Sequence, residues 1–307
     1  MLSNADLYGA GNDGIAVIGG VWDYDNLNQS PNLLVAAPFR VPKKFDPNFH
    51  FGDIFRFDRI TNLIVRGVTF RNPTTYSCHL TRAVHFRVDD IRFDFTTWNP
   101  QPLNMDGIHL DGGCRYGRIS NLHGTCFDDM VALNANDGCC SAYEGPISDI
   151  DIDWLYADWT HRGVRLLSTD PLSPVRRVTI RNIHIKTYRN AVALTHFFPD
   201  RPGRGTFDAI VVRDCFASSA PPPDFPQVND GTAWPIVWVQ KGCDVGNLVI
   251  ENLCRHETYS ARAPTIQVDD AARVEVMSVR NCRQTRSIDA SPEFFRGQAN
   301  VGELSVR

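Results

Sequence analysis

The sequence predicts an all-β protein built as a parallel β-helix, a solenoid of about 8–10 coils. One apolar pattern recurs along the chain at steps of 23 to 38 residues. The recurring segments are rich in Val and Ile, which favour strands over helices. Turns that contain Gly, Pro and Asn join them. We therefore expect the repeats to stack into one continuous parallel structure.

Each repeat has apolar residues at its first, third and sixth positions and a small or polar residue at its fifth. Alternation with a period of two predicts a strand that buries one face. The fifth position predicts a corner of the coil and falls at residues 67, 90, 121, 153, 182, 214, 252 and 278. The segments are 63–68, 86–91, 117–122, 150–152, 178–183, 210–215, 248–253 and 274–279, and a ninth copy over 15–21 is expected to open the series.

A two-sheet β-sandwich is the competing fold, because it also has short strands and turn signals. Corners of the Asn-Ile or Asn-Leu type at this period favour the solenoid, and leucine-rich, TPR and ankyrin signatures are absent. The run 218–223 ends in three prolines and predicts a stiff loop, since strands of the same pattern continue on both sides. We expect a single domain over residues 1–307.

Composition narrows the functional classes. The 307 residues are 43% hydrophobic, which is enough to bury a large core, and the formal net charge of −4 argues against a nucleic-acid-binding surface. No stretch approaches the ~20 apolar residues of a membrane span, and no export signal opens the chain. We expect a soluble protein with no membrane partner, either cytoplasmic or already processed.

The nine cysteines cannot all form internal disulfides. Cys78, Cys215, Cys254 and Cys282 lie in apolar strand-like contexts, where a free thiol is expected. No Cys-x-x-Cys or His/Cys spacing indicates zinc. We expect no metal and no cofactor.

Two acidic motifs give the main indication of function. Asp106 belongs to the run Asn-Met-Asp-Gly-Ile, and Asp128 and Asp129 follow about one coil later, before an apolar strand. Stacked coils would bring the carboxylates together. Inverting glycoside hydrolysis uses two carboxyl groups about 6.5–9.5 Å apart, one protonated and one ionised. Neighbours on a strand face opposite ways, so a bend or a strand start is expected between Asp128 and Asp129. The alternative is that all three are turn aspartates without catalytic function.

These motifs resemble those of the polygalacturonase-like glycoside hydrolases of family 28. The run 104–108 is similar to the Asn-Thr-Asp motif of that family, and 128–129 is similar to its Asp-Asp motif. Supporting matches are 19–23, like a Gly-Gly-x-Ile-Asp segment, and 71–76, like an Asn-Ser-Pro-x-Trp segment. The resemblance implies a single-stranded right-handed parallel β-helix of the pectin-lyase-like type and an extracellular or periplasmic location.

The same resemblance implies catalytic roles for the three aspartates. Asp128 would be the general acid, and Asp106 and Asp129 would polarise the attacking water. Asn104 would hydrogen-bond Asp106 or a sugar hydroxyl. His109 stands where the resemblance implies an acid, and it would either retune the site or cap a turn.

Further binding residues follow from two altered motifs. His161 stands in His-Arg-Gly where the family has Gly-His-Gly, and it would orient the acid or the substrate. The Arg-Ile-Lys motif falls on 193–195, Ala-Leu-Thr, so both cations are missing and galacturonate specificity is not expected. Arg165 and His196 are candidate replacements, with surface positions as the alternative. Tyr76 would stack on a sugar ring or pack in the core.

Three functional classes remain open from the sequence. The first is a hydrolase of a pectin-like or related polysaccharide or oligosaccharide. The second is a polysaccharide lyase that uses Arg162 or Arg165 as base with a calcium-bridged uronate. The third is a carbohydrate-binding or tail-spike-like module without catalysis. Uncapped ends of the stack would favour homo-oligomers.

Overall fold

The computed structural model describes residues 2–6, 9–32, 52–138, 141–198, 200, 202–223 and 233–307. The described chain is all-β, with two 3₁₀ turns, η1 (Asn26–Asn28) and η2 (Gln298–Asn300), as its helical segments. In this part of the chain no helix is long and apolar enough to cross a membrane.

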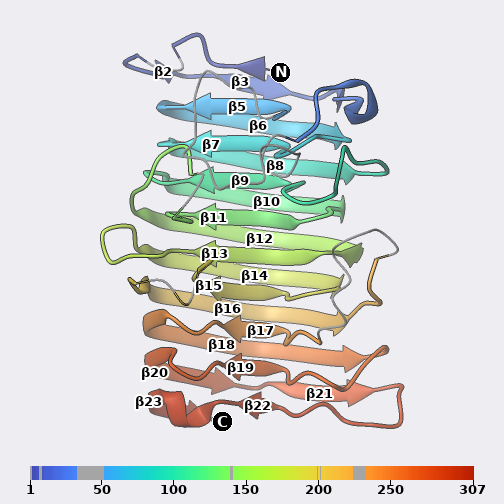
Figure 1. The fold of residues 1–307 in the computed structure, drawn as a ribbon, viewed down its shortest axis with the longest axis vertical. Coiled ribbons are helices and arrows are strands. Elements are labelled where there is room, and N and C mark those ends of the chain that lie inside the picture. Colours follow the sequence, from blue (N-terminus) through green and yellow to red (C-terminus); the bar gives the residue numbers. More distant parts are fainter. Residues whose placement is uncertain are drawn as a thin grey trace.

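The strands form two long parallel sheets, and the chain passes back and forth between them (Figure 1). Along the chain, two strands that pair within one sheet are therefore separated by a strand of the other sheet. The ten-stranded sheet contains, in order, β1 (Leu2–Ser3), β5 (Phe55–Asp58), β7 (Cys78–Thr81), β9 (Ile108–Asp111), β11 (Asp129–Asn134), β13 (Arg162–Leu167), β15 (Val192–Thr195), β17 (Val237–Val239), β19 (Ile266–Val268) and β22 (Phe295–Arg296).

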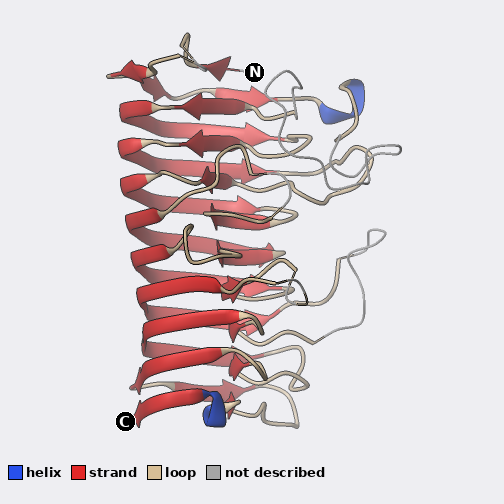
Figure 2. Cartoon of the chain, turned by 60° about the vertical axis from the view of Figure 1, so that its left-hand side comes forward, coloured by secondary structure: helices blue, strands red, loops and turns tan. Residues whose placement is uncertain are grey.

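The thirteen-stranded sheet has longer strands, which lie beside the shorter ones along the whole stack (Figure 2). Its main path is β2 (Asn12–Asp13), β6 (Ile60–Arg71), β8 (Val84–Asp94), β10 (Arg115–Thr125), β12 (Ile147–Thr160), β14 (Val175–Thr187), β16 (Gly205–Ser219), β18 (Cys243–Glu257), β20 (Arg273–Arg280) and β23 (Val301–Val306). Outside this path, β3 (Ala16–Ile18) and β4 (Val21–Asp23) pair with β6, and β21 (Arg283–Arg286) pairs with β18.

The eight segments predicted as strands all lie in the thirteen-stranded sheet, which confirms them, and the ninth overlaps β3 and β4. In seven of the eight, the third positions stack as direct partners from strand to strand and are fully buried; in the eighth, Val276 is half-buried and pairs with Asn247. Each such side chain stabilises the fold by about 1.5–3 kcal/mol through burial. The stacked residues are Val65, Val88, Ile119, Ile152, Ile180, Val212 and Ile250.

Left-handed residues mark the predicted corners, with φ between 54° and 66° at 67, 90, 121, 182, 214 and 252. Two predicted corners were wrong. One corner was expected at Asp153 but lies at Trp154, which has φ 60°. Asp153 stands just before it and accepts a hydrogen bond from Asn182 Nδ2 at 2.8 Å. The corner expected at 278 is Asn281, whose Nδ2 donates to Asn252 Oδ1 at 2.7 Å and continues the corner ladder.

The core lies between the two sheets and runs along the stack. Phe55 packs edge to face on Phe70, and their ring centroids are 4.9 Å apart. The cysteines expected to be free are free, and of these Cys282 is only half-buried. The adjacent cysteines 139 and 140 lie outside the described residues.

Candidate functional site

The three aspartates of the acidic motifs converge where the chain enters the ten-stranded sheet. Asp106 lies just before β9, and β11 begins at Asp129, so the predicted strand start between Asp128 and Asp129 is confirmed. One carboxylate oxygen from each aspartate lies within 4.8 Å of the others. The cluster is thus tighter than the 6.5–9.5 Å separation expected from the sequence.

Close stacking of two coils produces this convergence. The amide of Gly107 donates to the carbonyl of Asp129 at 2.9 Å, and the amide of Asp129 donates to Asp106 Oδ1 at 3.2 Å. A Cβ at Gly107 would meet the carbonyl oxygen of Met130 at 2.5 Å. The glycine of this Asp-Gly pair therefore serves packing, because a side chain at this position would keep the coils from approaching so closely.

A small pocket with a cavity volume of about 60 Å³ opens at the cluster. Asp106 and Asp129 are only 4% and 2% exposed, whereas the side chain of Asp128 is 15% exposed and is met first from solvent. Most of the predicted site residues line the pocket: Tyr76, Asn104, Asp106, His109, Asp128, Asp129 and Arg165. His161 and His196 are not part of its lining.

Asp106 holds its proton near neutral pH. Burial raises the pKa of Asp106 to about 7; the hydrogen bond from His109 opposes the shift, and the charges of Asp129 and Asp128 add to it. The His109 Nδ1 to Asp106 Oδ2 distance is 2.6 Å. A carboxyl group that is protonated at neutral pH can act as a general acid.

Asp128 is held in the ionised form. Burial opposes its charge, but the hydrogen bond from His161 and the charge of Arg162 hold the pKa of Asp128 well below its usual range. His161 Nδ1 lies 3.2 Å from Asp128 Oδ1, and the backbone amide of Asn104 donates to Asp128 Oδ2 at 2.9 Å. Asn104 thus contacts Asp128 through its backbone, where the sequence suggested a contact with Asp106.

Asp129 is anchored by two arginines. Arg162 Nη1 donates to Asp129 Oδ1, and Arg165 Nη1 lies 3.8 Å from Asp129 Oδ2. Arg162 is 3% exposed, and its Nε also donates to Asn190 Oδ1 at 3.3 Å. Arg165 donates to Thr195 Oγ1 at 3.0 Å and lines the pocket. Arg165 is therefore the arginine that lines the pocket, and the buried Arg162 balances the negative charge of Asp129 from behind the pocket.

The two remaining histidines differ from expectation in their placement. His161 is 1% exposed, and among the described residues its Nε2 has no hydrogen-bond partner. Burial lowers the pKa of His161, which favours a neutral ring that donates from Nδ1 to Asp128. His196 is also 1% exposed and burial lowers its pKa, which does not favour the suggestion that it replaces a missing cation.

Tyr76 stacks on His109, with ring centroids 3.7 Å apart and an interplanar angle of 16°. One face of Tyr76 is thus covered by protein, and its side chain covers the imidazole that contacts Asp106. The role of Tyr76 in this structure is to wall the pocket beside the acid.

Sequence reasoning missed His79, Asp53 and Asp111, which lie directly behind His109. His79 and His109 are register partners on β7 and β9, and the signal was a histidine at matching places in Cys-His-Leu-Thr and Ile-His-Leu-Asp. His79, His109 and Asp111 are of types that bind metals, and one ligand atom of each lies within 4.8 Å of the others. Direct hydrogen bonds already join them, at 2.8 Å from His79 and 3.3 Å from His109 to Asp111.

Comparison of the chain with protein-family models and with curated proteins gives no match. The geometry of the aspartate cluster and the motif resemblance are therefore the basis for a functional assignment.

Proposed function

We propose that the chain is a glycoside hydrolase that cleaves a pectin-related polysaccharide or oligosaccharide, on a single-stranded right-handed parallel β-helix of the polygalacturonase-like type. The observation that carries this proposal is the convergence at one pocket of two carboxyl groups in different surroundings, Asp106, whose pKa burial raises to about 7, and Asp128, whose pKa is held below its usual range. Acid/base cleavage of a glycosidic bond requires this combination.

The two carboxyl groups take the opposite roles to those implied by the resemblance. Asp106 donates its proton to the leaving glycosidic oxygen as the bond from that oxygen to the anomeric carbon breaks. Asp128 orients a water molecule and accepts its proton as the water oxygen bonds to the same carbon. The transition state resembles an oxocarbenium ion, so the attacking water needs to be oriented more than it needs to be deprotonated early. A carboxylate that hydrogen bonds hold in place, such as Asp128, can orient the water even though its pKa is low.

The close spacing makes the stereochemical course a sharp test. Oxygens within 4.8 Å approach the ~5–5.5 Å spacing of retaining hydrolases, in which a carboxylate attacks the sugar directly. We favour inversion because both oxygens of Asp128 are already engaged, one by His161 and one by the Asn104 amide. Proton NMR of the first product anomer distinguishes the two courses.

The charge of the pocket supports a substrate other than galacturonate at the cleaved bond. Asp128 and Asp129 line it, and Arg165 already lies beside Asp129. The positions that would carry the missing cations, in Ala193-Leu194-Thr195, are buried in β15. The cations of the pocket lining are already engaged, Arg165 beside Asp129 and His109 between Asp106 and Asp111, so a uronate carboxylate would have to compete with them, whereas a neutral sugar would find hydrogen-bond partners.

The lyase alternative is less well supported. Abstraction of a sugar proton requires a base that reaches the substrate, and Arg162 is buried against Asp129 and Asn190. Arg165 lines the pocket, but it donates to Thr195 Oγ1 and lies 3.8 Å from Asp129, and both contacts favour its charged form. A lyase would release an unsaturated product that absorbs in the ultraviolet, and a hydrolase would not.

The experiment is a screen of plant and bacterial polysaccharides for reducing-end release by the wild-type chain. Asp106→Asn and Asp128→Asn should each lower the rate by at least about 100-fold, since general acid/base catalysis contributes about 10²–10⁴-fold. Asp90→Asn is the matched control, because Asp90 is an exposed corner residue on β8 with φ 57°. Full activity in either pocket variant, or glycan binding without turnover, would refute the assignment.

A further inference from the structure

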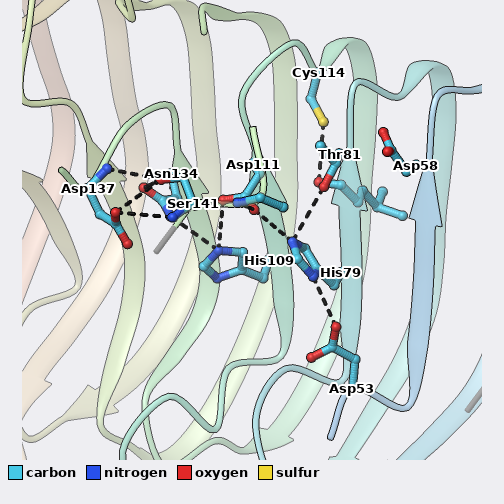
Figure 3. A network of polar contacts seen from close by, with 12 residues as sticks. Asp53, Asp58, His79, Thr81, His109, Asp111, Cys114, Asn134, Asp137 and Ser141 are labelled. Atoms are coloured by element: carbon cyan, nitrogen blue, oxygen red, sulfur yellow. Dashed lines mark hydrogen bonds and ion pairs between the residues drawn. The ribbon is translucent and has the colours of Figure 1, made fainter. Parts of the chain in front are cut away.

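A line of acids and histidines crosses β7 and β9 behind the pocket. It consists of Asp53, His79, Asp111 and His109 and is called the histidine chain below (Figure 3). His79 Nδ1 lies 3.0 Å from Asp53 Oδ2, and His79 Nε2 lies 2.8 Å from Asp111 Oδ2. His109 Nε2 lies 3.3 Å from Asp111 Oδ1, and His109 Nδ1 lies 2.6 Å from Asp106 Oδ2. All four imidazole nitrogens therefore face carboxylate oxygens.

The stacking of the ten-stranded sheet builds this line. His79 and His109 are direct register partners, and Asp111 is two residues beyond His109 on the same face of β9. Asp53 lies two residues before β5, the strand that pairs with β7 on its other side. Every member of the histidine chain is 5% exposed or less, so water does not screen these contacts.

The proton count follows from this geometry. A ring nitrogen that faces an ionised carboxylate must carry a proton, so His79, between Asp53 and Asp111, is a cation. His109 faces ionised Asp111 with Nε2 and donates from Nδ1 to Asp106 Oδ2, so it is also a cation when Asp106 carries its own proton on Oδ1. The histidine chain then alternates in charge, negative at Asp53, positive at His79, negative at Asp111 and positive at His109. These four charges sum to zero, which is the pattern that burial tolerates best.

The electrostatics of the individual groups agree with this pattern. Burial opposes the charge of His109, but hydrogen bonds with Asp106 and Asp111 raise its pKa to about 10. Burial also opposes the charge of His79, and hydrogen bonds with Asp111 and Asp53 raise its pKa. Burial alone would raise the pKa of Asp53 and of Asp111. The hydrogen bonds from the histidines outweigh it and lower the pKa of both carboxylates.

We propose that the histidine chain holds His109 as a cation against Asp106 and so limits how firmly that carboxyl keeps its proton. A buried acid beside Asp128 and Asp129 would otherwise retain its proton too tightly to donate it. Asp53, His79 and Asp111 are positioning residues, because they do not line the pocket and act through His109. This proposal rests on the proposed role of Asp106 as the acid.

Other ionisable groups face the histidine chain and its contact with Asp106, and they contribute to the same balance. They are Tyr24, Arg56 and Cys78 near Asp53, Cys114 near Asp111 with Asp58 on the other side of Cys114, Tyr76 over His109, and Cys126, Asp128 and Asp129 near Asp106.

The test is NMR of the full chain with ¹⁵N-labelled histidine, which reports the protonation of each ring nitrogen and needs no substrate. In the wild type, His79 and His109 should keep both ring protons at pH 8, well above the pKa of about 6.5 of a free imidazole. In Asp111→Asn, one amide oxygen replaces two acceptors. His109 should then lose its second proton at a pH lower by at least about 1 unit.

Asp53→Asn is the second variant, in case Asp111→Asn does not fold. In this variant His79 should lose its second ring proton at a pH lower by a similar amount, because the negative charge of Asp53 beside His79 Nδ1 is removed. Asp153→Asn is the matched control, since Asp153 is a 4% exposed carboxylate of β12 in the other sheet. That variant should leave the His79 and His109 signals unchanged.

Two results would overturn the proposal. One is a single ring proton on either histidine of the wild-type chain at pH 7. The other is purified protein with one equivalent of zinc that is lost in His79→Gln, because a metal would then occupy the place of the shared protons. An activity arm links the proposal to catalysis. When His109 loses its charge, the alkaline limb of the Asp111→Asn pH–rate profile should move to higher pH.

Discussion

At the scale of single residues, Asp106 and Asp128 show how neighbours separate two identical groups. Asp106 is 4% exposed, close to two other carboxylates, and touches one histidine. Asp128 is more exposed and receives hydrogen bonds from His161 and a backbone amide. The first environment favours the neutral acid and the second favours the anion.

This difference predicts how stability depends on pH. The folded-state pKa of Asp106 is raised to about 7, so the stabilisation from its proton is complete below the usual carboxyl range and is lost as pH rises through 7. Asp106→Asn removes this titration. The free energy of unfolding of the wild type should therefore fall between pH 5 and pH 8, and that of the variant should not. The difference, variant minus wild type, should be about 2 kcal/mol larger at pH 8 than at pH 5. Thermal unfolding at both pH values measures it, and an equal offset at the two would contradict it.

The convergence of the three aspartates was predictable from the sequence, but their protonation was not. Asn-Met-Asp-Gly and Asp-Asp stand one coil apart, so the meeting of Asp106, Asp128 and Asp129 was predictable. Which of them is protonated depends on His109 and His161, whose contacts become defined only when the coils stack. The reversed assignment of acid and base has this cause.

At the scale of elements, the approach of β9 and β11 depends on Gly107. Its backbone does not need positive φ, so the reason for glycine is space. Gly107→Ala would place a Cβ 2.5 Å from both the Met130 carbonyl oxygen and the Phe93 ring. We expect a loss of about 1–3 kcal/mol in stability, with lowered activity because Asp106 moves. Gly145→Ala is the control, since its Cβ would lie 3.0 Å from the Tyr143 ring and at ordinary contact distance, 3.8 Å, from the Gly113 backbone nitrogen.

The corners of the thirteen-stranded sheet combine two stabilising effects that can be separated. Asn182 has φ 54° and donates to Asp153 Oδ1 at 2.8 Å. Asn182→Ala should lose about 1–2 kcal/mol for the left-handed conformation and about 1 kcal/mol for the hydrogen bond. Asn182→Gly should lose mainly the hydrogen bond. Chemical denaturation of the two variants measures the difference, and equal losses would contradict this division.

Strands with long alternating patterns were predictable, and the shorter strands of the other sheet were less so. Val178, Ile180 and Ile183 repeat the apolar positions of the other long strands, whereas β17 and β19 have three residues each. Such short segments carry too few positions for a period to be seen. The corner at Trp154 was missed because a bulky residue is unfavourable at positive φ; there it stacks on His184, with ring centroids 6.2 Å apart.

At the scale of the whole molecule, each strand is held by the strands above and below it, so local stability should vary along the stack. In β10 and β12 the inward residues Ile119 and Ile152 are fully buried, and both strands have partners on two sides. Near the amino-terminal edge, Ile18 and Val21 are 66% and 59% exposed. Hydrogen exchange followed by mass spectrometry should therefore show the slowest amides in β8 to β16 and the fastest in β2 to β4. Uniform protection along the stack would contradict this, because it would require all described strands to open together.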